Sequence, residues 1–242
     1  MKSKQVALSE VTAVMCNYAR PGSARAVVKR LRNLGLTEII VWNNGGAKPV
    51  AEATQNINHA ENIGTIGRYH AALHSKRPYI LIVDDDVLLT KKGLEALLKY
   101  AGKYPLVVQA GLIYSSPFQK KPKRIKILSD QIKKPTAVDV AIANRGMIMN
   151  TDLYRSILKH WAWGCLQQVR QGFFTTDIPV SCATYDRTGR HPMVVPVSGR
   201  GYVMLPDEAP EKALRNQKNF NAEKTKILKW LVKRGWKLLG DR

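Results

Sequence analysis

Three short apolar runs, each associated with a segment of helical spacing, are the feature that most limits the fold of this chain. The runs cover residues 11–16, 38–44 and 79–83, and the helical patterns cover 24–36, 65–76 and 91–104. A fourth apolar run follows at 105–114. Strands that alternate with helices of this length form a parallel sheet with helices on both faces. We therefore predict an α/β fold that binds its ligand where the carboxyl ends of the strands meet.

Three aspartates stand where the third apolar run ends, in "YILIVDDDVLLT". Adjacent carboxylates repel one another, so either this tip is well solvated or a cation lies there. Asp84 and Asp86 occupy alternate positions of a strand end and would project to the same side, where a metal–diphosphate could bridge to them. The alternative is a solvated loop in which Asp86 caps the helix that follows. The residues alone leave both interpretations open.

Four motifs taken together are more specific than the aspartates alone. "VTAVMCNYARP", "EIIVWNNGG", "NIGTIGRYHAAL" and "YILIVDDDVLLT", in that order, resemble nucleotide-sugar glycosyltransferases of the GT-A fold, with the exostosin-type enzymes as the nearest likeness. The resemblance covers residues 10 to about 200, loosely after 115. It implies a GT-A-like, Rossmann-type and mostly parallel sheet, a UDP-sugar donor, and Mn²⁺ or Mg²⁺.

The same resemblance implies a set of site residues. The donor nucleotide and sugar would contact Asn17, Arg20, Asn43, Asn44, Asn62, Arg68, Asp84 and Asp85. The metal would be held by Asp86 together with Asp84, and His191 in "RTGRHP" would complete its shell from a late loop. Without the resemblance, Arg68 reads equally well as a charge on a helix surface, and His191 as a hydrogen-bonded loop residue.

The motif "TTDIP" is similar to the acidic motif that precedes the last core helix of such enzymes, which makes Asp177 the candidate catalytic carboxylate. Thr176 stands where the family usually has a second acid. Asp177 would act as general base in an inverting enzyme, or would stabilise the oxocarbenium-like transition state in a retaining one. The exostosin-type likeness implies retention.

The charge balance points to a polyanionic partner, because 39 Lys and Arg face only 18 Asp and Glu, for a formal net charge of +21. Seven of these cations, against one Asp, lie in residues 115–134, which we predict to be a basic loop on the active-site side of the sheet. Phosphates of the acceptor would contact Lys120, Lys121, Lys123, Arg124 and Lys126. A solvated loop without a partner is the alternative.

The C-terminal segment 223–242 is basic and amphipathic. Its apolar stripe comprises Leu228, Leu231, Val232 and Leu239, with Trp230 and Trp236 at the edges. Such a helix either lies on an anionic membrane or packs on the domain through its stripe.

Three functions are compatible with these features. The favoured one is a glycosyltransferase that modifies a hydroxymethylated base in DNA, as some phages encode. The second is a peripheral membrane enzyme that extends a lipid-linked glycan or lipopolysaccharide. The third is a basic nucleic-acid-binding protein on a degenerate transferase fold, against which the intact aspartates argue.

We expect three segments: a donor-binding half (1–115), an acceptor-side half of the same domain (116–210) and the basic tail (211–242). The sequence shows no membrane span or signal peptide, and its three cysteines are isolated. We therefore expect a reduced protein of the cytoplasm, or of the host cytoplasm if it is viral. The sequence names neither the sugar nor the oligomeric state.

Overall fold

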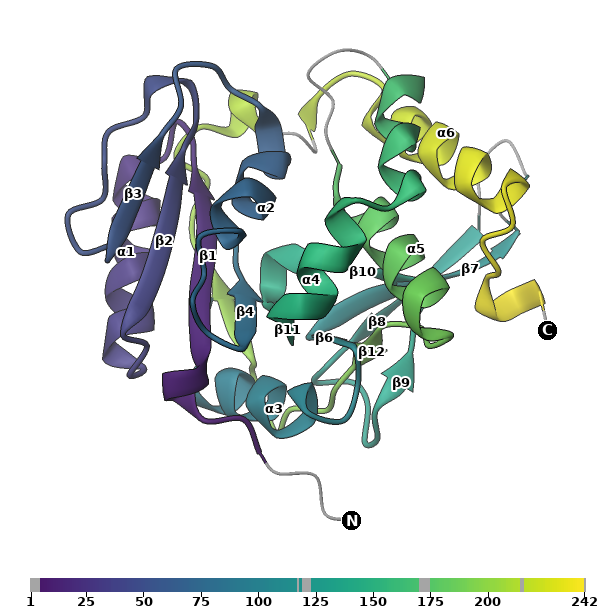
Figure 1. The fold of residues 1–242 in the computed structure, drawn as a ribbon, viewed down its shortest axis with the longest axis horizontal. Helices are drawn as coiled ribbons and strands as arrows, with labels where there is room; N and C mark the ends of the chain where they lie inside the picture. Colours follow the sequence, from purple (N-terminus) through teal and green to yellow (C-terminus); the bar gives the residue numbers. More distant parts are fainter. Residues whose placement is uncertain (1–4, 117, 119–122, 170–174, 214–215, 242) are drawn as a thin grey trace.

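A computed structural model describes residues 5–116, 118, 123–169, 175–213 and 216–241 (Figure 1). Within them, one sheet has eight strands in the order β3-β2-β1-β4-β11-β6-β12-β9. Their bounds are β1 (Val11–Asn17), β2 (Glu38–Asn43), β3 (Gln55–Asn58), β4 (Tyr79–Ile82), β6 (Leu106–Val108), β9 (Thr136–Ala137), β11 (Met147–Asn150) and β12 (Met193–Val194). The predicted α/β fold with a mostly parallel sheet is confirmed: β1 pairs with β2 and β4 in parallel, and β2 with β3.

Helices cover both faces of this sheet. They are α1 (Pro21–Asn33), α2 (Gly67–Ala72), α3 (Lys91–Ala101), α4 (Thr151–Leu158), α5 (Asp177–Thr188) and α6 (Phe220–Lys233). Alternate strand residues point to opposite faces, so Val14 packs with the side of α2, α4, α5 and α6, whereas Met15 packs with α1 and α3 (Figure 1). Thr90, and not Asp86, caps α3, because its hydroxyl accepts the backbone N–H of Gly93 at 3.0 Å.

Strand β11 departs from the parallel pattern. It lies antiparallel between β4 and β6, with Met147 opposite both Ile82 and Val108. A buried apolar run looks the same in either direction, so the sequence pattern carries no information on strand direction here.

The other strands of the described residues form two small sheets. They are β10-β7-β8, formed by β7 (Ala110–Ser116), β8 (Lys123–Leu128) and β10 (Val140–Ala141), and β13-β5, formed by β5 (Val87–Leu89) and β13 (Tyr202–Met204). The run 105–114, predicted as one strand, is divided between β6 and β7 in different sheets. The prediction of a loop over 115–134 is wrong for β8, which pairs antiparallel with β7. Most of β8 is exposed, so its pairing leaves no apolar pattern in the sequence.

The C-terminal segment packs on the domain. Ile227, Leu228 and Leu231 of α6 are at most 1% exposed, and Trp236 and Leu238 beyond the helix are also buried in the same core cluster. Figure 1 shows α6 beside α5. The helix ends at Lys233, short of the predicted end, and Gly235 turns the chain with a φ of +99°. Within the described residues, every helix is too short or too polar to cross a membrane.

Candidate active site

A cavity of about 400 Å³ lies where the carboxyl ends of β1, β2 and β4 meet the first turns of α2, α5 and α6. Residues from all three predicted segments line it, among them Arg20, Asp84, Asp177 and Lys224. Cys16 also lines it, and burial raises the pKa of this thiol to about 12, so it is neutral. The position agrees with the sheet edge expected from strand order.

Arg68 is the centre of the first ionic cluster. It lies in the first turn of α2, is 3% exposed, and pairs with Asp84 through Nη1 and with Asp177 Oδ1 at 3.2 Å through Nη2. Nη2 also donates to the hydroxyl of Thr176 at 3.3 Å. The preceding Gly67 permits this placement, because a Cβ there would lie 2.4 Å from Trp42 Cδ1.

The electrostatics of this cluster set the ionisation of its members. Burial alone would lower the pKa of Arg68, but Asp84 and Asp177 outweigh burial and raise it, so the guanidinium stays charged. Burial raises the pKa of Asp177 above its ordinary value, and Arg68 offsets part of that effect. Asp177 is therefore a carboxylate with increased proton affinity, held in place by a fixed cation.

Arg20 is the centre of a second cluster. Its Nη1 lies 3.0 Å from Asp85 Oδ1 and 3.3 Å from Asp86 Oδ2, and its Nε lies 3.0 Å from Asp207 Oδ1. Burial raises the pKa of Asp85 to about 7, although Arg20 opposes the rise. The triple aspartate is thus divided between two arginines, with Asp84 on one and its two neighbours on the other.

A strap of residues 205–213 lies across the second cluster. The backbone N–H of Leu205 donates to the carbonyl of Asp86 at 2.8 Å, and Asp207 reaches Arg20. Glu208 accepts from Ser23 Oγ at 2.8 Å and from the backbone N–H of Gly22 at 3.2 Å, so it sits at the N-terminus of α1. The strap could not be predicted from the sequence, because these contacts join segments far apart in the chain.

The predicted asparagines separate into two groups. Asn17 and Asn43 do not line the cavity, and their buried amides tie three strand ends together: Asn17 Nδ2 donates to Asn43 Oδ1 at 2.9 Å, and Asn43 Nδ2 to Asn58 Oδ1 at 2.9 Å. Asn44 and Asn62 line the cavity wall. Asn44 is held by a bond of 2.9 Å to the carbonyl of Gly64.

The sequence matches the profile of glycosyl transferase family 2 over residues 12–163, which is more than half of the chain. The chain belongs to glycosyl transferase family 2. Its structure is similar to the crystal structure of residues 1–349 of TarS from S. aureus, with a TM-score of 0.52 and 12% identity over 93% of this chain and 71% of that one. At this identity the likeness shows the fold alone. A search of curated proteins found no match.

Family membership identifies an enzyme that transfers a sugar from a nucleotide-sugar donor, on a GT-A fold. This part of the sequence interpretation is confirmed. The likeness to the exostosin type stays a prediction, because the family that matches is family 2.

A divalent metal is the further group that this glycosyltransferase family generally uses. The described residues contain no group of three His, Cys, Asp or Glu side chains placed to hold an ion. Asp84 and Asp86 nevertheless supply carboxylate oxygens at the cavity wall, which suits an ion that completes its shell with phosphate oxygens and water. Asp84 and Asp86 therefore fit a divalent metal ion whose remaining ligands are phosphate oxygens of the donor and water.

His191 does not join the aspartates. Its ring lies tilted against the Tyr185 ring with centroids 4.4 Å apart, and its Nδ1 lies 4.0 Å from Asp139 Oδ1. It is buried there and does not line the cavity. The turn after α5 places it against Tyr185 and Asp139, away from the cavity wall, so we drop it from the proposed metal shell.

Lys224 is the main residue of this glycosyltransferase site that sequence analysis overlooked. It lines the cavity from α6, where burial lowers its pKa and Asp177 raises it in part. Helical spacing does separate Lys224 from its exposed neighbours, because it lies four residues before Leu228 and seven before Leu231, in line with the apolar stripe. Of the predicted acceptor residues, Lys123, Arg124 and Lys126 are exposed on β8, whereas Lys120 and Lys121 lie outside the described residues.

Proposed function

We propose that this family 2 glycosyltransferase moves a sugar from a UDP-sugar, with Mn²⁺ or Mg²⁺, to a hydroxymethylated base in phage-type DNA. The observation that carries the acceptor is the basic strand β8 beside the cavity. Arg124 of β8 donates from Nη2 to Asn221 Oδ1 at 3.4 Å, and the neighbouring Phe220 lines the cavity. A polyanionic chain on β8 would therefore pass close to the donor site.

On the donor side, the proposal assigns the nucleotide to the wall formed by Asn44 and Asn62, and the sugar to the side of Asp84. Asn17 and Asn43 would act from behind this wall, by holding the strand ends in register. Arg20 and Arg68 would orient the aspartates toward the donor. Asp86 with Asp84 would hold the metal, which when bound supplies positive charge to the leaving diphosphate.

Asp177 is the proposed base. In the inverting form, one carboxylate oxygen of Asp177 takes the proton of the acceptor hydroxyl. The hydroxyl oxygen bonds to the anomeric carbon while the bond from that carbon to the diphosphate oxygen breaks, which releases UDP. The raised pKa of Asp177 supports this role, since a base works best when its pKa approaches the working pH. In the retaining form that the exostosin-type likeness implies, Asp177 would stabilise the cationic sugar.

The acceptor base has to leave the duplex stack to reach the cavity, as other enzymes that modify bases require. The proposal places the enzyme in the cytoplasm, where DNA is accessible. The membrane alternative loses its main support, because Leu228 and Leu231 of the amphipathic stripe are buried in the core. Membership of a transferase family weighs against a purely DNA-binding role.

The test is transfer of radiolabelled sugar, from a panel of nucleotide sugars, to a duplex that contains hydroxymethylcytosine. We expect transfer to this duplex, none to the unmodified duplex, and dependence on added Mn²⁺ or Mg²⁺. Transfer to a lipid-linked glycan with none to DNA would overturn the acceptor. Donor titrations with Mn²⁺ in the Asp86→Ala variant test the metal separately, and an unchanged titration sinks that assignment.

A further inference from the structure

Arg145 is a partly buried cation that the proposed reaction does not use. It ends the 3₁₀ turn η4 (Ala143–Arg145), and the side-chain amide of Gln109 donates to its carbonyl at 2.9 Å. Among the described residues, its Nε and Nη1 are buried and have no hydrogen-bond partner. The guanidinium carbon lies 5.0 Å from the centroid of the Tyr202 ring. A desolvated guanidinium without an acceptor is costly, and a bound anion would remove that cost.

The cations next to Arg145 continue toward the cavity. Lys126 and Arg124 are two residues apart on β8 and so point to the same face. Partial desolvation lowers the pKa of Lys126, although the residue is largely exposed, and repulsion from Arg145 and from Arg124 lowers it further. Arg124 likewise repels Lys224, which lines the cavity. We name these four residues, Arg145, Lys126, Arg124 and Lys224, the cation row.

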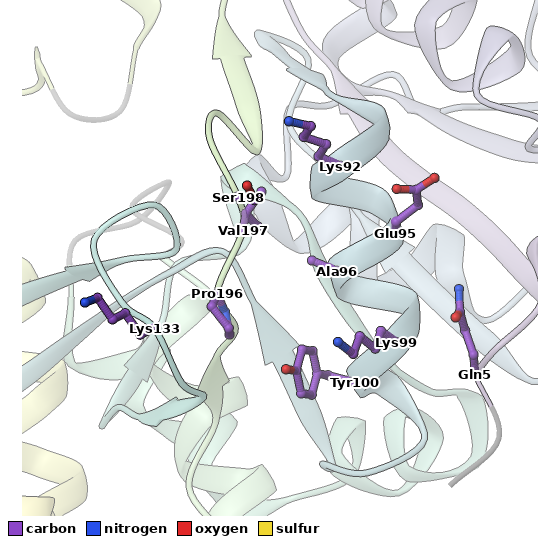
Figure 2. A pocket seen from close by; sticks show the side chains of 10 residues that line it. All are labelled: Gln5, Lys92, Glu95, Ala96, Lys99, Tyr100, Lys133, Pro196, Val197 and Ser198. Atoms are coloured by element: carbon purple, nitrogen blue, oxygen red, sulfur yellow. The ribbon is translucent and has the colours of Figure 1, made fainter. Parts of the chain in front are cut away.

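The cation row differs from an ordinary basic surface. A second basic region, a groove of about 680 Å³ between α3 and residues 196–198, has Lys92, Lys99 and Lys133 at its rim. Figure 2 shows these lysines on separate parts of the rim, with Glu95 between Lys92 and Lys99 on α3. Lys99 also lies over the Tyr100 ring, 5.4 Å from its centroid. The groove thus has a carboxylate between two of its cations, whereas Lys126 of the row is repelled by two other cations, Arg145 and Arg124.

We propose that the cation row is a phosphodiester-binding subsite that holds the acceptor backbone as it enters the cavity, with Arg145 at the outer end and Lys224 at the inner end. Successive phosphates would occupy the space between the repelling cations. The inference rests on the proposed DNA acceptor and adds Arg145 and Lys224 to it. Asn144, next to Arg145, lines the cavity, so the turn η4 connects the proposed subsite with the site.

The test is binding of a short fluorescent DNA duplex without modified bases, measured by anisotropy over a salt titration. Each phosphate contact contributes about 0.9 to the slope of log K against log salt for duplex DNA. We expect Arg145→Gln and Lys126→Gln each to weaken binding and to lower that slope by about 0.9. Lys133→Gln in the groove of Figure 2 removes the same charge, and we expect it to leave the slope unchanged.

A wild-type slope in both row variants overturns the proposal, and so does an equal fall in the Lys133→Gln control. Lys126 is exposed, so its variant remains informative if Arg145→Gln has a lowered melting temperature. Vesicles of phosphatidylglycerol form a second arm: row-dependent binding to vesicles with none to duplex also overturns it. Sugar transfer by the wild-type enzyme is measured separately, so a failed transfer assay counts against the proposed function and leaves the binding result intact.

Discussion

The two ionic regions around the cavity are built from the same kinds of side chain and differ in how the charges meet. On the donor side, Arg68 and Arg20 each contact carboxylates at salt-bridge distance. In the cation row, the neighbouring charges that act on Lys126 are those of Arg124 and Arg145, which are also cations and repel it. The donor side is therefore balanced within the protein, and the row is not. The positive charge of the chain is less compensated along the row than on the donor side, so a polyanionic partner should be sought there.

Asp177 belongs to both regions, because it forms an ion pair with Arg68 and its charge raises the pKa of Lys224. We expect Asp177→Asn to reduce the rate of sugar transfer by about 10²–10⁴-fold, the usual contribution of a general base, with donor binding retained. Single-turnover transfer and donor titration measure the two effects. Asp152→Asn on the exposed start of α4 is the matched control. A loss below tenfold would remove Asp177 from the chemistry.

Removal of Arg68 should break the balance on the donor side. Arg68→Met leaves Asp84 and Asp177 without their shared cation in a buried site, so we expect the free energy of unfolding to fall by about 3–5 kcal/mol. Lys126→Met, by contrast, removes a cation that only repels its neighbours, and we expect a change within about 0.5 kcal/mol. Urea unfolding of both variants measures the difference. Equal losses of unfolding free energy in the two variants would mean that the charge of Lys126 is compensated within the protein as well as that of Arg68.

Much of the donor side could be predicted from sequence because it depends on local order. Each strand that is buried on both faces is an apolar run, and the residues that follow it reach the same sheet edge. Asp84 and Asp86 were predicted on this basis, and both line the cavity. The family resemblance added Arg68 and Asp177, and the structure joins them in one ion pair.

The acceptor side could not be predicted in the same way, because it depends on contacts between distant segments. β8 pairs with β7 through backbone hydrogen bonds, and its side chains are largely exposed and basic. A sequence of that kind has the composition of a loop, so the strand was not predicted. Lys224 reaches the cavity because it lies on the same face of α6 as Leu228 and Leu231, which pack in the core one and two turns further on. The strap carrying Asp207 depends on a pair with Arg20 across most of the chain. No spacing rule in the sequence encodes such pairs.

The position of Lys224 depends on the packing of α6 in the core. Substitution of Leu231 tests how much that packing stabilises the protein. Leu231 is fully buried on α6, so we expect Leu231→Ala to lower the free energy of unfolding by about 2–5 kcal/mol. Lys233→Ala, at the exposed end of the same helix, is the control, with little change expected. Urea unfolding and vesicle sedimentation are measured together. Reduced vesicle binding without lost stability would show that the apolar face serves a membrane.

The smallest expected effect concerns the ionisation of Lys224, the one row residue that also faces a carboxylate. Burial lowers its pKa in the folded protein, whereas in the unfolded chain the pKa lies near the ordinary value of about 10.4. Between these two values the unfolded chain binds more protons than the folded protein, so this residue contributes stability that rises with pH. We therefore expect the stability of the wild type relative to Lys224→Met to increase with pH across that window, as measured by urea unfolding at successive pH values. A constant difference would mean that Asp177 cancels burial and the repulsion of Arg124, which would assign Lys224 to the balanced donor side. Adding Arg124→Gln sharpens the result, because the pH dependence should weaken once that repulsion is removed.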